Sequence, residues 1–166
     1  MSDSPIDITG PAAWRAEIEL MLGPLMARFE DTFGYPPGDN RIRDPDPGSA
    51  ERRGLPPPLA TFYQVIGEVA LPDIGNGHFV HAAGAVLCQL REEGPVRVAD
   101  GVDGVVFASN GGGILYAIDA AGAVHRSHVA SRDGDFAPIA TDLAEYLDRL
   151  REVVAEFVAT GDPGDL

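Results

Sequence analysis

The sequence predicts an α+β fold, with a mostly antiparallel central sheet and flanking helices. Amphipathic helical patterns lie near both ends of the chain, and between them short β-like runs are separated by Gly, Asp and Asn. The length of 166 residues suits a single domain, which usually has roughly 100–200 residues. An apolar content of 45% is typical of a globular protein rather than a disordered chain.

Residues 1–34 form an N-terminal helical segment that opens near Pro11, since proline is favoured in the first turn of a helix. Pro24 has no amide hydrogen, so we expect a kink or a break into two helices there. The apolar residues recur at spacings of three and four and form one broad face: Trp14, Ile18, Met21, Leu22, Leu25, Met26, Phe29 and Phe33. The sequence leaves open whether this face packs on the rest of the chain or on another copy.

Residues 35–54 are rich in Pro and Gly and predict a long loop, the best candidate in the chain for a mobile linker. A core of residues 55–160 follows. It opens with a helix that Pro58 can start and that contains Leu59 and Phe62, with Gly67 at its end. We expect strands at Phe79–His81, Val86–Leu90 (strand or short helix), Val96–Ala99, Val105–Ser109, Ile114–Ile118 and Val124–Val129.

A glycine-rich turn, Gly111–Gly113, follows Asn110 between two of these strands and predicts a hairpin. A phosphate-binding loop would need a helix after the glycines and usually a Lys, but a strand follows here and the chain has no Lys. Tyr116 and Ile118 should face one side of the sheet and Leu115 the other, because side chains alternate along a strand. The next strand then completes an antiparallel meander.

The last helix is the clearest, with Thr141 as candidate N-cap and Gly161 and Pro163 at its end. Its buried stripe is expected to comprise Leu143, Tyr146, Leu147, Leu150, Val154 and Phe157. Residues 161–166 form a tail that we expect to be frayed. The four segments together predict one compact domain.

The charge excludes two classes of partner. Twenty-six acidic side chains against 12 arginines give a net charge of −14, which disfavours binding to nucleic acid and to anionic membranes. The N-terminus lacks the pattern of a secretory signal, no window is apolar enough for a membrane span, and Cys88 is the only cysteine. We therefore expect a cytoplasmic protein.

No pattern predicts an active site, a metal site or a cofactor. The histidines form two pairs, His78 with His81 and His125 with His128, but residues three apart on a strand point to opposite faces. Two surface histidines and two in the sheet or its turns are the simplest interpretation. Cys88 lies in an apolar run and is expected to be a small buried hydrophobe.

The segment from Leu55, LPPPLATFYQVIGEVALPDIGNGHFVH, resembles the opening helix of the SUKH superfamily, which includes fungal cell-wall-synthesis regulators and bacterial immunity proteins. VVFASNGGGILYAIDAAGAVHRS is similar to the Gly-Gly-Gly hairpin of that family, and residues 141–157 correspond to its closing helix. The resemblance covers roughly residues 55–158. Its matching residues are interpreted as fold determinants rather than as a site.

The resemblance implies a non-catalytic, cytoplasmic protein-binding domain, and above all an immunity protein that neutralises a toxin by covering it. The partner would be a basic protein, since opposite charges speed association. Candidate contact residues lie in two acidic loops: Asp73, Asn76, His78, Asp100 and Asp103. Two alternatives remain, a regulatory or scaffold protein that binds an endogenous partner and a small enzyme. The sequence does not indicate the oligomeric state.

Overall fold

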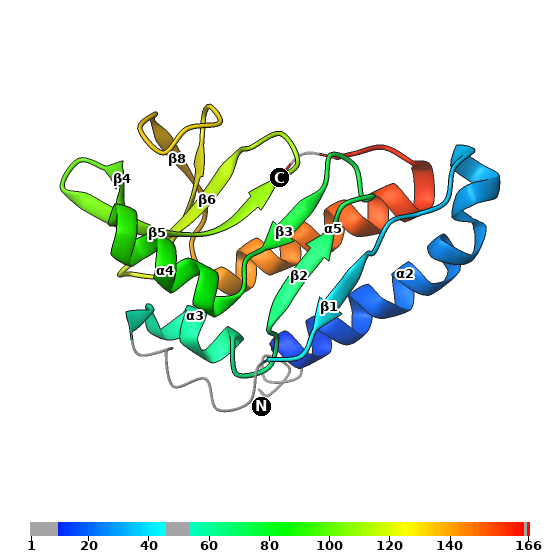
Figure 1. The fold of residues 1–166 in the computed structure, drawn as a ribbon, viewed down its shortest axis with the longest axis horizontal. Coiled ribbons are helices and arrows are strands. Elements are labelled where there is room, and N and C mark those ends of the chain that lie inside the picture. The colour runs from blue at the N-terminus through cyan, green and yellow to red at the C-terminus, as the bar shows by residue number, and fades with distance from the viewer. Residues whose placement is uncertain (1–9, 46–53, 165) are drawn as a thin grey trace.

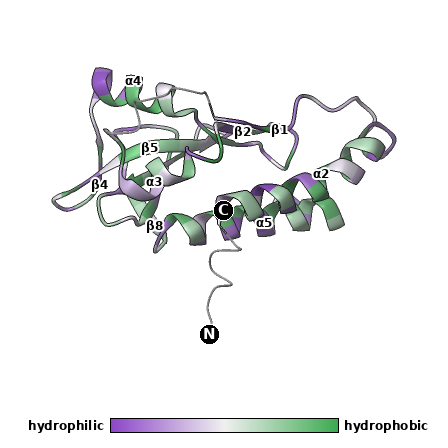
Figure 2. Cartoon of the chain, turned by 90° about the horizontal axis from the view of Figure 1, so that it is seen from below, coloured by the Kyte–Doolittle hydropathy of each residue, from purple (hydrophilic) through white to green (hydrophobic). Residues whose placement is uncertain are grey.

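The computed structural model of the chain describes residues 10–45, 54–164 and 166. Within these ranges, helices and one eight-stranded antiparallel sheet confirm the α+β class. Helices α2 (Pro11–Phe33) and α5 (Leu143–Thr160) cover one face of the sheet, and α4 (Ala83–Glu93) lies on the other side (Figures 1 and 2). The short helix α3 (Pro57–Phe62) precedes β2.

The sheet has the strand order β1-β2-β3-β5-β6-β7-β8, and β4 pairs with β5 beside this path. β4 pairs with the first residues of β5 and β3 with its last residues, along the same edge, because β6 occupies the other edge. β5 is therefore the central strand. The strands are β1 (Arg41–Arg43), β2 (Glu68–Leu71), β3 (His78–Val80), β4 (Val96–Ala99), β5 (Val102–Asn110), β6 (Leu115–Asp119), β7 (Val124–Ser127) and β8 (Phe136–Ala140).

The predicted meander is confirmed and continues into β8. Tyr116 and Ile118 pack in the large core beneath α2 and α5, whereas Leu115 packs on the opposite face. That opposite face holds a second, smaller core of Val96, Val98, Val106, Ala117 and Phe136. The ambiguous run Val86–Leu90 is part of helix α4.

Helix α2 packs within the chain, against α5. Trp14 Nε1 donates to the carbonyl oxygen of Leu147 at 2.7 Å, and the rings of Phe33 and Phe157 stack with centroids 5.6 Å apart. We expected either a kink or a break at Pro24; the helix continues through this residue, so the break is absent. Its apolar stripe is long enough that packing on α5 compensates for the one hydrogen bond that proline removes.

Part of the expected linker is ordered. Ile42 lies in the edge strand β1, and its carbonyl oxygen accepts a hydrogen bond from Arg15 on α2 at 2.9 Å. Residues 46–53 lie outside the described residues. Gly67 does not end helix α3, which stops at Phe62; it passes so close to β1 that a Cβ there would lie 2.3 Å from the carbonyl oxygen of Asp44.

Helix α5 matches its predicted span, but its N-cap is Asp142 rather than Thr141. The Asp142 side chain accepts from the backbone N–H of Glu145 at 2.8 Å, and Glu145 in turn accepts from Thr141. The tail does not fray over its described residues. Leu166 is buried in the main core, and the tail passes close to the β2–β3 turn.

Candidate functional site

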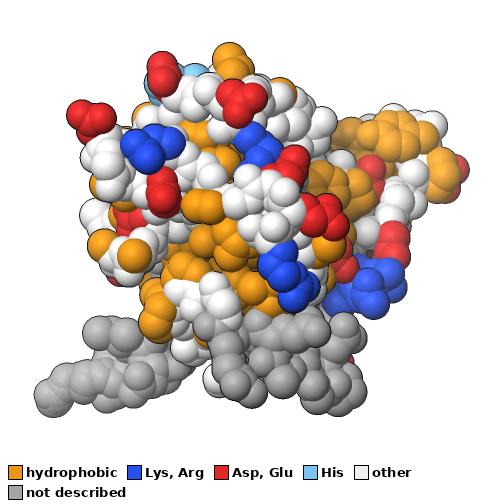
Figure 3. All heavy atoms as spheres, turned by 60° about the vertical axis from the view of Figure 1, so that its left-hand side comes forward, with side chains coloured by type: hydrophobic (Ala, Val, Ile, Leu, Met, Phe, Trp, Pro, Cys, Tyr) orange, Lys and Arg blue, Asp and Glu red, His pale blue; other side chains and the backbone are white. Residues whose placement is uncertain are grey.

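An apolar groove of about 270 Å³ lies at the end of the molecule formed by α3 and the β4–β5 hairpin. Figure 3 shows this side, with apolar side chains gathered at its centre and charged side chains around them. The prolines are rigid, and Pro57 and Pro95 are exposed. The groove is lined by Gly54, Leu55, Pro56, Pro57, Pro95, Asp103, Gly104, Val105, Ile118 and Ala120.

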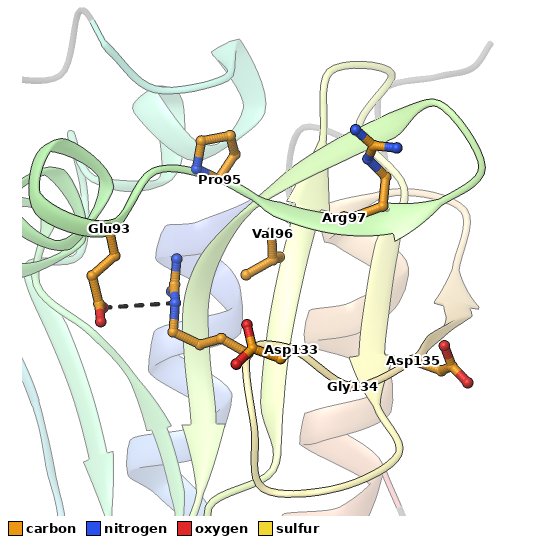
Figure 4. Close-up of a pocket in the computed structure, with 8 residues that line it drawn as sticks. Glu93, Pro95, Val96, Arg97, Asp133, Gly134 and Asp135 are labelled. Atoms are coloured by element: carbon orange, nitrogen blue, oxygen red, sulfur yellow. Dashed lines mark ion pairs between the residues drawn. The ribbon is translucent and has the colours of Figure 1, made fainter.

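A second, polar hollow of about 370 Å³ shares Pro95 with the groove. Arg132 holds its wall together, since it lies 3.6 Å from the Glu93 carboxylate and donates to the carbonyl oxygen of Gly94 at 2.6 Å. These contacts fasten the loop after β7 to the end of α4 (Figure 4). Asp133 and Asp135 lie on the same loop. We call the groove, this hollow and the β4–β5 hairpin the Pro95 surface.

The Pro95 surface is acidic. Residues 91–104 and 128–135 contain six carboxylates and three arginines. Arg97 pairs with Asp103 at 3.0 Å, but both side chains are more than half exposed, so the pair adds little stability. Asp100 is exposed at the hairpin tip. The surface thus presents an apolar groove beside an excess of solvated negative charge.

The structure divides the candidate contact residues between the two ends of β5. Asp100 and Asp103 belong to the Pro95 surface, whereas Asp73, Asn76 and His78 lie at the β2–β3 turn, beside the last residues of β5. The nine-residue strand separates the two groups by roughly 25 Å, at about 3.3 Å per residue. A compact contact area would therefore include only one group.

The residues at the β2–β3 turn are engaged within the chain. Asp73 accepts from the backbone N–H of Gly38 at 2.6 Å and from the Asn40 side chain at 2.7 Å. His78 is 6% exposed, which contradicts its assignment to an exposed contact loop. Its side chain points to the face covered by α5 because it alternates with Phe79.

The histidines are more buried than expected, since only His128 is exposed. His125 Nε2 lies 2.8 Å from Asp119 Oδ2, and Asp119 also accepts from the amides of Ala121 and Ala123. Burial raises the pKa of Asp119, but these hydrogen bonds outweigh it and hold the pKa below its usual value. The pair fastens the β6–β7 turn.

His81 lies 2.8 Å, through Nε2, from Ser109 Oγ, a nucleophile–base distance that the sequence does not predict. Burial lowers the pKa of His81, against the opposing effect of Glu68. Within the described part of the chain, however, the other ring nitrogen of His81 has no hydrogen-bond partner that would fix its orientation. The described ranges also contain no group of three His, Cys, Asp or Glu side chains placed to hold a metal ion.

Cys88 is exposed on α4, contrary to the expectation of a buried residue. Helix α4 turns Val86 and Leu87 inward, so Cys88 one position later faces solvent. Its thiol lies 3.4 Å from Glu92, and this hydrogen bond with the nearby negative charge raises the pKa of the thiol. The thiolate, which is the reactive form, is therefore disfavoured.

The groove was not predicted because it is assembled from segments that are far apart in the sequence. Pro95 and residues 54–57 carry no polar pattern, and residues 131–135 read as an ordinary acidic loop. Among the residues that the structure describes, no helix combines the length and apolarity of a membrane span. Comparisons with family models, curated proteins and solved structures gave no match to the chain.

Proposed function

We propose that the protein is a non-catalytic, cytoplasmic protein-binding domain, and that it neutralises a basic toxin by covering it with the Pro95 surface. The observation that carries the proposal is the apolar groove at Pro95 beside the exposed carboxylates of Asp100 and Asp103. An apolar depression rimmed by polar side chains is typical of a protein-interaction site. The resemblance to the immunity proteins of the SUKH superfamily supports the same role.

The two parts of the Pro95 surface would contribute differently to binding. A side chain inserted between Pro57, Pro95 and Val105 would remove apolar area from water, and this burial provides affinity. The carboxylates at the rim would attract a basic partner and orient it, and this attraction mainly raises the association rate. The net charge of −14 acts in the same direction.

The test begins with capture of partners from the source organism at low salt. Association of each purified partner is then measured by surface plasmon resonance at low and high NaCl concentration, and its toxicity is measured with and without co-expression of the protein. We expect protection by the wild-type protein. We also expect the double variant Asp100→Asn/Asp103→Asn to associate about tenfold more slowly at low salt.

The double variant Glu152→Gln/Glu156→Gln is the matched control. It removes the same two charges from the exposed side of α5, away from the Pro95 surface, and should associate at the wild-type rate. If both double variants slow association equally, the effect comes from the net charge of the protein and not from the position of Asp100 and Asp103. Binding that does not respond to salt, or a partner that shows no toxicity, would contradict the proposal.

A further inference from the structure

A small, partly open cavity of about 50 Å³ lies at the far end of β5, remote from the Pro95 surface. Its lining residues come from the β2–β3 turn, from strands β3, β5, β6 and β7, and from the tail after α5. At this size it holds a few waters or one small ion, since a single water needs roughly 10–15 Å³. It is lined by Asn76, His78, Asn110, Tyr116, Arg126, Pro163, Gly164 and Leu166.

Strand register explains why polar side chains meet there. His78 pairs with Asn110, and Tyr116 pairs with Arg126, so each pair lies on one face of the sheet. Tyr116 belongs to the core beneath α5, which places Arg126 on that face as well. Helix α5 ends at Thr160, so the tail covers this part of the sheet.

His78 is the first anomaly. Its side chain is buried, yet neither Nδ1 nor Nε2 has a hydrogen-bond partner among the residues that the structure describes. A buried polar group without a partner costs about 1–3 kcal/mol, so such groups are rare in folded proteins. Burial also lowers the pKa of His78 to about 4, so the imidazole is neutral at pH 7 and has one N–H to donate.

Arg126 is the second anomaly. Its Nε is buried without a partner, and no hydrogen bond or ion pair engages its guanidinium in the described residues. The other half-buried arginines of the described ranges, Arg15, Arg132 and Arg151, all have carboxylate partners. A half-buried guanidinium at a cavity, with no counter-ion among the described residues, is complementary to an anion that can accept two parallel hydrogen bonds.

Asn110 contributes a further donor. Its Oδ1 accepts from the amides of Gly112 at 2.9 Å and Ile114 at 3.1 Å, which fixes the side chain and leaves the Nδ2 group as its other polar end. His78, Asn110 and Arg126 therefore all offer N–H groups, and the described residues that line the cavity include no Asp or Glu.

We propose that this cavity binds one small oxyanion, a carboxylate or a phosphate, held by Arg126 with His78 and Asn110. Arg126 would bind two oxygens through its planar fork, and His78 would donate one hydrogen bond. The bound anion would satisfy the buried donors and would fasten the tail to the sheet. Because the chain is strongly acidic, a general attraction of anions would not account for binding.

The experiment measures thermal unfolding of the full chain at constant ionic strength, with chloride replaced stepwise by inorganic phosphate, sulfate or formate. Isothermal titration calorimetry with the same anions gives the affinity. We expect at least one oxyanion to raise Tm and to bind with 1:1 stoichiometry. Arg126→Gln should lose this response, whereas Arg91→Gln should retain it, because Arg91 is an exposed arginine on α4 outside the cavity.

Arg126→Lys keeps the charge but lacks the fork, and should bind at least about tenfold more weakly than the wild type. If Arg126→Gln does not fold, this variant and the ring signals of labelled His78 during the titration decide the question. The relative affinities of phosphate and formate show whether the cavity prefers a phosphate or a carboxylate. Absence of oxyanion binding by the wild type, or an equal response of Arg126→Gln and Arg91→Gln, would overturn the proposal.

Discussion

Burial of His78 makes folding stability depend on pH in a defined window. Burial lowers the pKa of His78 from 6.5 to about 4 in the folded protein, whereas the unfolded chain keeps the ordinary value near 6.5. Between these two values the unfolded state binds a proton that the folded state does not. Acidification in this window therefore favours unfolding, and this group has no further effect above or below it.

The size of the effect follows from the interval between the two pKa values. A pKa difference of one corresponds to about 1.4 kcal/mol, so the interval from 6.5 to about 4 corresponds to about 3 kcal/mol. Domains of this size unfold with about 5–15 kcal/mol, so the loss is a large fraction of the total. Burial also lowers the pKa of His81, which adds to the wild-type dependence.

Urea unfolding from pH 7 to pH 4, in buffers free of phosphate and carboxylate, measures the effect. The His78→Gln variant should lose about 3 kcal/mol less stability over this range than the wild type. His128→Gln, at an exposed position, is the control and should follow the wild-type curve. The substitution can also change stability equally at every pH, so the test is the slope of stability against pH: parallel curves for His78→Gln and the wild type would refute the prediction.

Two further predictions concern the packing of the fold. A Cβ at Gly111 would lie 1.9 Å from the carbonyl oxygen of Asn76, so Gly111→Ala should cost more than about 2 kcal/mol, whereas Gly112→Ala, whose nearest atom lies 3.4 Å away, should stay within about 0.5 kcal/mol. Equal losses in urea unfolding would show that this contact is not the reason for the glycine. Phe29→Ala should cost about 3–5 kcal/mol because Phe29 is fully buried between α2 and the core. Leu20→Ala, at a side chain 76% exposed, is its control, and a small loss at Phe29 would mean that α2 contributes little to stability.

Elements with a strong local pattern could be predicted from the sequence. The hairpin at Asn110 needs a side chain that satisfies backbone amides and glycines that allow close approach, and both are visible in adjacent residues. Helix α5 likewise shows its stripe and its terminating Gly161, which has φ 81°. The predicted N-cap, Thr141, is one position before the observed N-cap, Asp142, because both residue types suit that role.

Strands that depend on distant partners were missed. Ile42 lies in a three-residue strand within a Pro-rich segment, and this strand is stabilised by partners distant in sequence: pairing with β2, burial of Ile42 in the main core and the hydrogen bond from Arg15. Strand β8 contains Pro138, which argues against a central strand but is tolerated at the edge of the sheet. Strand β2 has only four residues, too few to show a clear alternation.

Only the acidic part of the candidate site could be predicted, because acidic residues are visible in the sequence without knowledge of the fold. Asp100 and Asp103 stand out in the sequence as acidic residues beside glycines, and they do lie on an exposed surface. The groove beside them requires Pro57, Pro95 and Ala120 to meet, which depends on the tertiary fold. His78 was misassigned because strand parity decides its burial, and a shift of one residue would turn it to solvent.

The position of β5 makes the Pro95 surface and the polar cavity independent of each other. Both are built on this strand, but at opposite ends, and β5 is hydrogen-bonded along both edges and buried through its middle at Val106–Ala108. A strand held in this way cannot readily transmit a change in register, because a slip of one residue would move buried side chains to the other face. Substitutions more than about 10 Å apart and without shared partners act additively. A loss of partner binding in the Asp100→Asn/Asp103→Asn variant therefore reports on the Pro95 surface, and a loss of anion binding in Arg126→Gln reports on the cavity.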